Sequence, residues 1–307
     1  MSLSFRQVAA LWKEEKRLYV KKSSYAIYVN LLNLYILPAF RGSTRPGQED
    51  VQAFADRMLA DGHALKTVKD TLLVLRMILR LGTKLGAWPA VDSGVHFPTQ
   101  AQREKAPAVL SVDQQKRLLG YLRQNPSAKN IGILICLYAG LRIGEICALQ
   151  WRDLDLRSGV LHVRKTVQRI SFADDGVREN YLLLGPPKTS SSLRDIPLPG
   201  ALTRMLRPLG RQASPDFFVV SGSSTPYEPR YYRAYFRRLL ARLGIPPVRF
   251  HALRHSFATR CIQSRCDYKT VSAILGHASI STTLDLYVHP GLEDKKKAIE
   301  KMARGLG

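Results

Sequence analysis

Residues 86–109 carry no apolar periodicity, whereas the segments on both sides of them do. This stretch, GAWPAVDSGVHFPTQAQREKAPAV, contains three prolines and follows a series of helical patterns. Proline together with the loss of an apolar repeat is typical of a connection between domains. We therefore expect two domains, residues 1–100 and 111–307, joined by a linker at 101–110. A chain of 307 residues is long enough to bury a core in each of them.

The first domain is predicted to be a small helical bundle. Residues 3–40 show two helical apolar repeats, and Pro38 is expected to end the second, with Ser23 and Ser24 as candidate N-caps. A third helix is expected at 49–60 and a fourth at 66–85. The fourth carries an apolar stripe, and on a neighbouring face it carries Lys69, Arg76 and Arg80. A basic stripe beside a core stripe suits a helix on a DNA backbone or groove, although a solvated outer face has the same pattern.

The second domain is predicted to be helical around a small β segment. Ser111 followed by Gln114 is a capping box that should start a helix, and residues 131–138 are apolar all round, as in a buried helix. Alternating patterns predict strands at the following places: 160–167, 180–184 and 193–198, with a turn at 174–176. Helix returns at 228–243, where Arg230, Arg233 and Arg237 share one face and could reach DNA phosphates or guanine edges. A charged, solvated face is the alternative.

The charge composition indicates which class of binding partner the chain has. The chain has 47 Lys and Arg against 24 Asp and Glu, a formal charge of +23, which favours a polyanion such as nucleic acid. Neither a membrane segment nor a disulfide or zinc framework is expected. The longest apolar run, 131–139, is far below the ~18–20 residues of a membrane span, and the N-terminus lacks a signal-peptide pattern. Four cysteines, at spacings that fit no common zinc motif, are expected to be free and buried.

The residues from His251 to Tyr287 carry the chemistry. His251 and Arg254 are three positions apart, so they should share a helix face, and His277 and Tyr287 follow in LGHASISTTLDLYVH. Arginine binds phosphate oxygens, histidine donates to them or moves protons, and a tyrosine hydroxyl can attack phosphorus. The stretch therefore predicts a phosphoryl-transfer site that needs no metal.

Three further residues upstream are candidates for the site. Arg142 lies in AGLRIGEICAL between two core-like segments, where a merely solvated charge is not expected, and Glu145 one turn later could hold its guanidinium. Lys188 lies in the connection between the second and third strands. Taken alone, a lysine in such a connection is usually just exposed.

With these segments in this order, the chain resembles the tyrosine recombinase, or phage integrase, family over residues 3 to about 290. AGLRIGEICAL matches the first box, PPKTSSSLRDIPL the lysine hairpin, HALRHSFAT the second box and LGHASISTTLDLYVH the last. The resemblance implies a mostly α fold with a small antiparallel sheet. It implies a helical core-site DNA-binding domain, of the core-binding, SAM-like type, and an α+β catalytic domain with a C-terminal tail.

The resemblance also implies roles for the matched residues. Arg142 and Arg254 would clamp the scissile phosphate, His277 would donate a hydrogen bond to it, and Glu145 would orient Arg142. Tyr287 would attack to give a 3′-phosphotyrosyl enzyme, Lys188 would protonate the leaving 5′ oxygen, and His251 would help move the tyrosine proton. No cofactor and no metal are expected. The expected partners are double-stranded DNA with specific core sites, a homotetramer on two sites, and an accessory directionality protein, at the nucleoid in the cytoplasm with no membrane.

Several functions remain open at this level. The helical domain begins almost at Met1, so we expect no further domain for arm-type sites such as many phage integrases carry. The integrase or excisionase of a compact mobile element, acting through a Holliday junction, is the main hypothesis. A dimer-resolving Xer-type recombinase fits as well. Type IB topoisomerase-like relaxation and a non-catalytic DNA-binding regulator are two further hypotheses.

Overall fold

The computed structural model describes residues 3–42, 45–90, 93–98, 108–174, 176–187, 189–287 and 292–304. The chain forms two compact units. The first comprises Met1–Arg103 with Arg169–Tyr181, and the second comprises Glu104–Gln168 with Leu182–Gly307. In the described part of the chain, no helix has both the length and the apolar character that a bilayer span requires.

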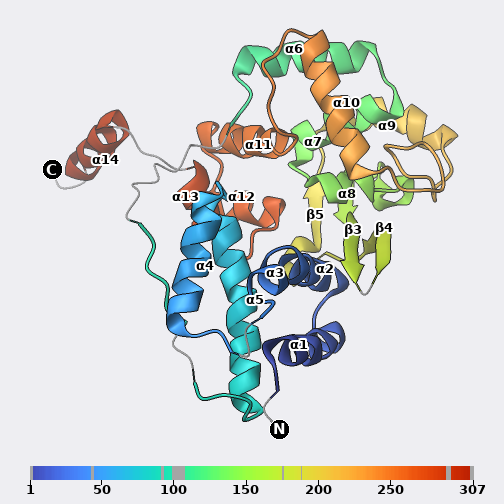
Figure 1. Ribbon diagram of the computed structural model, residues 1–307. Coiled ribbons are helices and arrows are strands. Elements are labelled where there is room, and N and C mark those ends of the chain that lie inside the picture. The colour runs from blue at the N-terminus through green and yellow to red at the C-terminus, as the bar shows by residue number, and fades with distance from the viewer. Residues whose placement is uncertain are drawn as a thin grey trace. The chain divides into compact units, whose positions relative to one another are not determined.

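The first unit is a helical bundle, as the apolar repeats predict (Figure 1). Its helices are α1 (Phe5–Tyr19), α2 (Lys22–Leu31), α3 (Leu37–Ala39), α4 (Gln48–Ala60) and α5 (Leu65–Lys84). The predicted apolar stripe of α5 is buried in the core of this unit, where α5 packs against α1 and α4.

Two local expectations for this unit were wrong. Neither Ser23 nor Ser24 caps α2, because the N-cap is Lys21 and it makes no side-chain cap hydrogen bond. Pro38 does not end the helix either. The chain widens into a π turn at Leu32–Ile36 and continues through Ala39. A wider turn before proline accommodates a ring that lacks an N–H and would crowd the preceding turn of an α-helix.

A β-hairpin joins the first unit from far along the chain. Strands β3 (Thr166–Asp174) and β4 (Val177–Gly185) pair with each other, and residues 169–181 belong to the first unit. Asp174 accepts hydrogen bonds from Lys13 Nζ (2.7 Å) and Tyr25 Oη (3.2 Å). Burial and the Asp174 carboxylate raise the pKa of Tyr25 to about 12. The hairpin is thus fixed to the helices by side-chain bonds.

The second unit is a helical domain around a three-stranded antiparallel sheet. Its strands, in the order β1-β2-β5, are β1 (Leu154–Asp155), β2 (Val160–Val163) and β5 (Arg194–Pro197). Its helices are α6 (Val112–Gln124), α7 (Ala128–Ala139), α8 (Ile143–Cys147), α9 (Gly200–Gln212), α10 (Pro229–Arg242), α11 (Ala252–Gln263), α12 (Tyr268–Leu275), α13 (Ser281–Tyr287) and α14 (Leu292–Arg304). The predicted fold class, mostly α with small antiparallel sheets, is confirmed.

The structure confirms one local prediction for the second unit and differs from others. The capping box of Ser111 and Gln114 at the start of α6 is confirmed. The strand expected at 160–167 is divided between β2 and β3, because the chain leaves the sheet at Arg164 and Lys165. The side chain of Arg164 donates to Val163 O, and that of Lys165 donates to Gln150 Oε1. Helix α9 was missed. All four cysteines are free, but Cys261 is only half-buried and Cys266 is exposed rather than buried.

Gly82 offers a test of the packing in the first unit. A Cβ at this position of α5 would overlap the indole of Trp88, whose Nε1 donates to Leu79 O (3.1 Å). Although Ala is the better helix former, Gly82→Ala should lower the free energy of unfolding by about 1–3 kcal/mol through over-packing. Gly120→Ala in α6, where no atom lies within 4 Å of the new Cβ, should instead raise it by roughly 0.5–1 kcal/mol. Urea denaturation of both variants measures the difference, and an unchanged Gly82→Ala protein would contradict the described packing.

Candidate active site

Arg142 is held at the start of α8 by Glu145. Gly140 ends α7 in the left-handed conformation (φ 61°), and Arg142 then takes the N-cap position of α8. Its backbone N–H donates to Glu145 Oε2 (2.9 Å), and its Nη1 lies 2.8 Å from Glu145 Oε1. Its Nη2 donates to Gly276 O (2.9 Å), so the ion pair expected from the sequence is present and is tied to a second segment.

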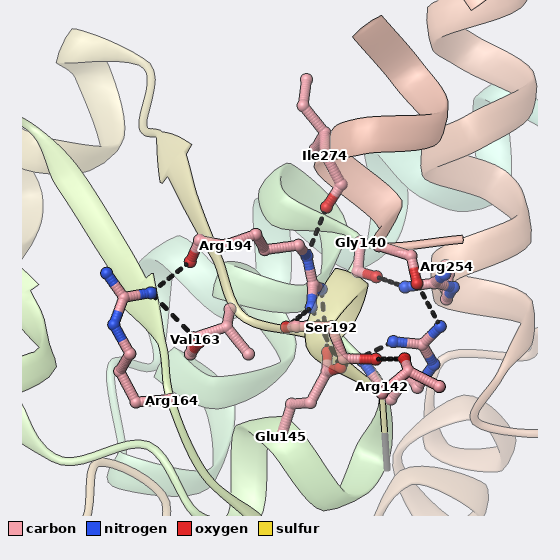
Figure 2. Close-up of polar contacts among 11 residues, drawn as sticks. Gly140, Arg142, Glu145, Val163, Arg164, Ser192, Arg194, Arg254 and Ile274 are labelled. Carbon is pink, nitrogen blue, oxygen red and sulfur yellow. Dashed lines mark hydrogen bonds and ion pairs between the residues drawn. The ribbon is translucent and has the colours of Figure 1, made fainter. Parts of the chain in front are cut away.

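A further arginine, Arg194, shares the same carboxylate (Figure 2). Its Nη1 and Nη2 donate to Glu145 Oε1 (3.0 Å) and Oε2 (2.9 Å), and both side chains are buried. Its Nε donates to Ile274 O, and its Nη1 also donates to Ser192 O. Burial opposes ionisation of Glu145, but the hydrogen bonds and charges of Arg194 and Arg142 outweigh it and lower the pKa of Glu145. Glu145 therefore carries its negative charge at neutral pH.

Arg194 was not singled out from the sequence, although a signal for it exists. Its strand β5 alternates buried and exposed residues, and Arg194 has the same phase as Ile196. An arginine on the inward face of a strand needs an acidic partner, because a buried charge without one is too costly. Glu145 is that partner.

Arg254 is a nearly completely buried cation. It is 1% exposed on α11, and its Nη1 donates to Gly140 O (3.0 Å). Its Nη2 has no hydrogen-bond partner among the described residues. Burial and the nearby charge of Arg142 lower the pKa of Arg254 to about 9, which still leaves it charged at neutral pH. Figure 2 shows Arg142 and Glu145 from the start of α8 near Arg194 of β5 and Arg254 of α11.

His277 follows the turn that receives Arg142. Gly276 caps α12 with a left-handed φ of 66°, and the Nδ1 of the next residue, His277, lies 2.8 Å from Thr283 Oγ1. Burial, then the charges of Arg254 and Arg142, lower the pKa of His277 to about 4. The ring is therefore neutral at pH 7. When the Thr283 hydroxyl donates to Nδ1, the proton sits on Nε2, which can donate to a ligand.

Tyr287 ends α13 in the interior of the same unit. The residue is 9% exposed and packs with Ala258, Val271 and Leu275. Its Oη lies 2.6 Å from Nδ1 of His255. Burial raises the pKa of Tyr287, while Arg254 and then Arg142 act against that rise. The phenol is thus protonated and hydrogen-bonded to a histidine that the sequence did not mark as a site residue.

His251 and His255 are neighbours on α11. His251 is the N-cap residue of the helix, and its ring meets the ring of His255 edge to face at 4.5 Å. Desolvation of the ring, followed by the effects of His255 and Arg254, lowers the pKa of His251. The hydrogen-bond partner of the Tyr287 hydroxyl is His255, whereas His251 was the residue predicted to move its proton. The spacing of four from His251, and the position next to Arg254, could have identified His255.

A cavity opens beside these residues. It measures about 440 Å³ and is lined by Arg142, Glu145, Thr166, Gln168, Pro187, Thr189, Ser192, Gly276, His277, Ala278 and Thr282. Lys188 lies outside the described residues, and its two neighbours in the sequence, Pro187 and Thr189, line the cavity. Within the described part of the chain, no group of His, Cys, Asp and Glu side chains is arranged to hold a metal ion.

The predicted DNA-contacting residues fall on the two helices expected. In the first unit Lys69 and Arg80 of α5 are exposed, whereas Arg76 is half-buried and donates from Nε to Ser93 O (2.9 Å). Lys69 also lies over the ring of Phe97. In the second unit a groove of about 820 Å³ follows α10, and its lining includes Arg230, Arg233, Arg237, Arg249 and His251. This groove therefore reaches a candidate catalytic residue.

The chain is similar to known proteins in sequence and in fold. Residues 108–293 match the model of the phage integrase family. A XerC-like tyrosine recombinase of Caldanaerobacter subterraneus subsp. tengcongensis is 30% identical over 185 residues, which make up 55% of this chain and 47% of that protein. The ICEBs1 integrase of Bacillus subtilis (strain 168) is 22% identical over 324 residues, covering 98% of this chain and 83% of that protein. The chain thus spans about half the length of the first relative and most of the second.

Solved structures share the fold. The Tn1549 transposon integrase in complex with transposon right-end DNA matches with a TM-score of 0.78 at 22% identity, over 96% of this chain and 99% of that chain. A lambda integrase dimer bound to a core site matches with a TM-score of 0.67 at 17% identity, over 94% of this chain and 79% of that chain. With a family match across more than half of its length, on the fold of known integrases, this chain belongs to the phage integrase family of tyrosine recombinases.

Proposed function

We propose that the protein is a site-specific DNA recombinase, the integrase or excisionase of a mobile element, which cuts and rejoins DNA through a 3′-phosphotyrosyl intermediate. The observation that carries the proposal is Arg254. A buried guanidinium whose Nη2 lacks a partner among the described residues costs about 1–3 kcal/mol, and a phosphate oxygen would satisfy it. Tyr287, the candidate nucleophile, lies in the same unit, close enough for the charges of Arg254 and Arg142 to act on its hydroxyl.

The charge balance of the site supports a phosphodiester substrate. Three guanidiniums, those of Arg142, Arg194 and Arg254, face one carboxylate, that of Glu145. The excess positive charge is fixed by hydrogen bonds before the substrate arrives. Such preorganised charge stabilises the extra negative charge that develops on the non-bridging oxygens during attack.

In the proposed reaction, Arg142 and Arg254 bind the non-bridging oxygens of the scissile phosphate, and His277 adds a hydrogen bond from Nε2. The Tyr287 oxygen forms a bond to phosphorus while the bond from phosphorus to the 5′ oxygen breaks. Lys188 supplies a proton to that leaving oxygen, and His251 assists in moving the tyrosine proton. The 3′-phosphotyrosyl bond keeps the energy of the phosphodiester, so a 5′-hydroxyl of a partner duplex can reverse the step on a new strand.

We propose duplex DNA with specific core sites as the substrate and a homotetramer on two sites as the active assembly. The +23 charge and the arginine-lined groove of α10 support a DNA partner. A lambda integrase tetramer bound to a Holliday junction has the same fold, with a TM-score of 0.65 at 16% identity. The protein would then act at the nucleoid, and an accessory protein would set its direction.

Two alternatives share this chemistry. A Xer-type role in dimer resolution is supported by relatives such as the XerC tyrosine recombinase of Xanthomonas axonopodis pv. citri (strain 306), which is 32% identical over 191 residues and 60% of this chain. The mobile-element hypothesis is favoured because the ICEBs1 integrase matches 98% of the chain. The second alternative, a type IB topoisomerase-like enzyme, would relax supercoiled plasmids of any sequence.

The primary test is covalent capture. The protein is incubated with a library of random duplexes, and DNA that stays attached after denaturation is sequenced to define the site. Wild type should give covalent complexes, and Tyr287→Phe should give none, because it removes only the attacking oxygen. A covalent band with Tyr287→Phe would refute the nucleophile, and relaxation of plasmids without the selected site would favour the topoisomerase-like alternative.

Arg194 should be needed for cleavage although it need not touch the substrate. Arg194→Met leaves Glu145 with Arg142 as its remaining ionic partner, and we expect the free energy of unfolding to fall by about 3–5 kcal/mol. Cleavage of the selected site should fall on the order of 10²-fold as Arg142 shifts. Arg207→Met, an exposed arginine on α9, is the matched control, and equal losses for both arginines would contradict the role.

The two basic helices should make separable contributions to DNA binding. Arg80→Ala on α5 and Arg237→Ala on α10 should each weaken binding and reduce the slope of log affinity against log salt by about 1, because each removes one cation from a DNA phosphate. Arg76→Ala should weaken binding too, with an added loss of stability because Arg76 bonds to Ser93 O. Fluorescence anisotropy at several salt concentrations measures this, and unchanged slopes for Arg80 and Arg237 would mean that both faces are merely solvated.

A further inference from the structure

We propose that His255 is a catalytic residue that takes the proton of the Tyr287 hydroxyl when the phenol attacks phosphorus. The inference rests on the proposed function and assigns one step within it. It depends first on geometry, because Nδ1 of His255 lies 2.6 Å from the Tyr287 oxygen, which is hydrogen-bond distance to the reacting atom.

Secondary structure fixes this contact on both sides. His255 lies near the start of α11, and its backbone N–H bonds to His251 O (3.1 Å). Tyr287 is the last residue of α13, where it is 9% exposed and packs against Ala258 and Leu275. Neither side chain is a freely moving surface group, so the pair is built into the fold of the second unit.

The charges around the pair suit a neutral acceptor. The facing groups are Arg254 and His251 on α11, Arg142 at the start of α8, and Tyr287 itself on α13. Burial, then the charge of Arg254, lowers the pKa of His255, so its ring is neutral at pH 7 and can accept a proton. The same arginines would stabilise the phenolate that forms.

The proton balance of the step is complete. The phenol proton moves to Nδ1 of His255 and gives an imidazolium, and the oxygen electron pair forms the bond to phosphorus. The bond to the 5′ oxygen breaks, and that oxygen receives a proton from Lys188, the general acid of the proposed reaction. On rejoining, the imidazolium returns its proton to the departing tyrosine oxygen. His251 makes no hydrogen bond to Tyr287 among the described contacts, so its assistance in the proposed reaction would act through His255, whose ring it contacts edge to face.

The test measures cleavage of the captured site by His255→Asn and His255→Ala as a function of pH. Asparagine places a hydrogen-bonding atom near the Nδ1 position but cannot take the proton. Both variants should cleave on the order of 10²-fold more slowly than wild type at neutral pH. Their rates should rise with pH as the phenol ionises unaided, whereas the wild-type rate should be flat above the lowered His255 pKa and fall below it. His162→Asn, which removes an imidazole on β2, should behave as wild type.

A fluorotyrosine at position 287, which ionises at lower pH, should restore cleavage in both His255 variants. A structural role would predict the opposite, namely a loss that is the same at every pH and is not restored by fluorination. That result, or wild-type rates in both variants, would overturn the inference while leaving the recombinase function intact. Absence of any covalent complex with wild type would instead refute the proposed function.

A second readout needs no DNA. The ¹⁹F resonance of 3-fluorotyrosine at position 287 should move in wild type as His255 titrates, and it should lose that dependence in His255→Asn. The measurement covers the case in which His255→Ala fails to fold, because wild type alone reports the contact. A resonance that ignores the titration in wild type would overturn the inference.

Discussion

The charge of one buried carboxylate organises the second unit. Glu145 is bonded to the guanidiniums of Arg142 and Arg194, which reach it from the start of α8 and from strand β5. Those arginines bond in turn to the carbonyls of Gly276 and Ile274 at the end of α12. Because removing Glu145 would leave both arginines without their ionic partner, and removing Arg194 would leave a buried carboxylate with fewer hydrogen bonds, the sheet and the two helical segments are held in one arrangement.

The same arrangement leaves positive charge uncompensated. One carboxylate cannot neutralise three guanidiniums, and Arg254 in particular is buried with an N–H group that has no partner among the described residues. A buried donor without a partner is typical of sites where a bound ligand supplies the missing acceptor. Here the ligand that fits is an anion with several oxygens.

The proposed nucleophile lies in a protected environment. Tyr287 is buried within its own chain and bonded to His255, so its phenol is protonated and oriented before any substrate is present. This contact connects the second box of the family to the last one through two helices of the second unit. Placement of the Tyr287 hydroxyl therefore depends on the packing of α11 and α13 as much as on the tyrosine itself.

The sequence by itself determined the helical periodicity, the fold class, and the boxes that contain Arg142, Arg254, His277 and Tyr287, because these depend on local spacing. Its predictions for Ser23, Pro38 and the strand at 160–167 were wrong, since local propensity yields to packing. The catalytic roles of these residues and of Lys188 stay predictions. The tertiary structure alone decided the partners: Arg194 on Glu145, His255 on Tyr287, and the hairpin at Asp174 on Lys13 and Tyr25. Contacts between residues 32 to 161 positions apart follow from how the elements pack, which no local pattern encodes.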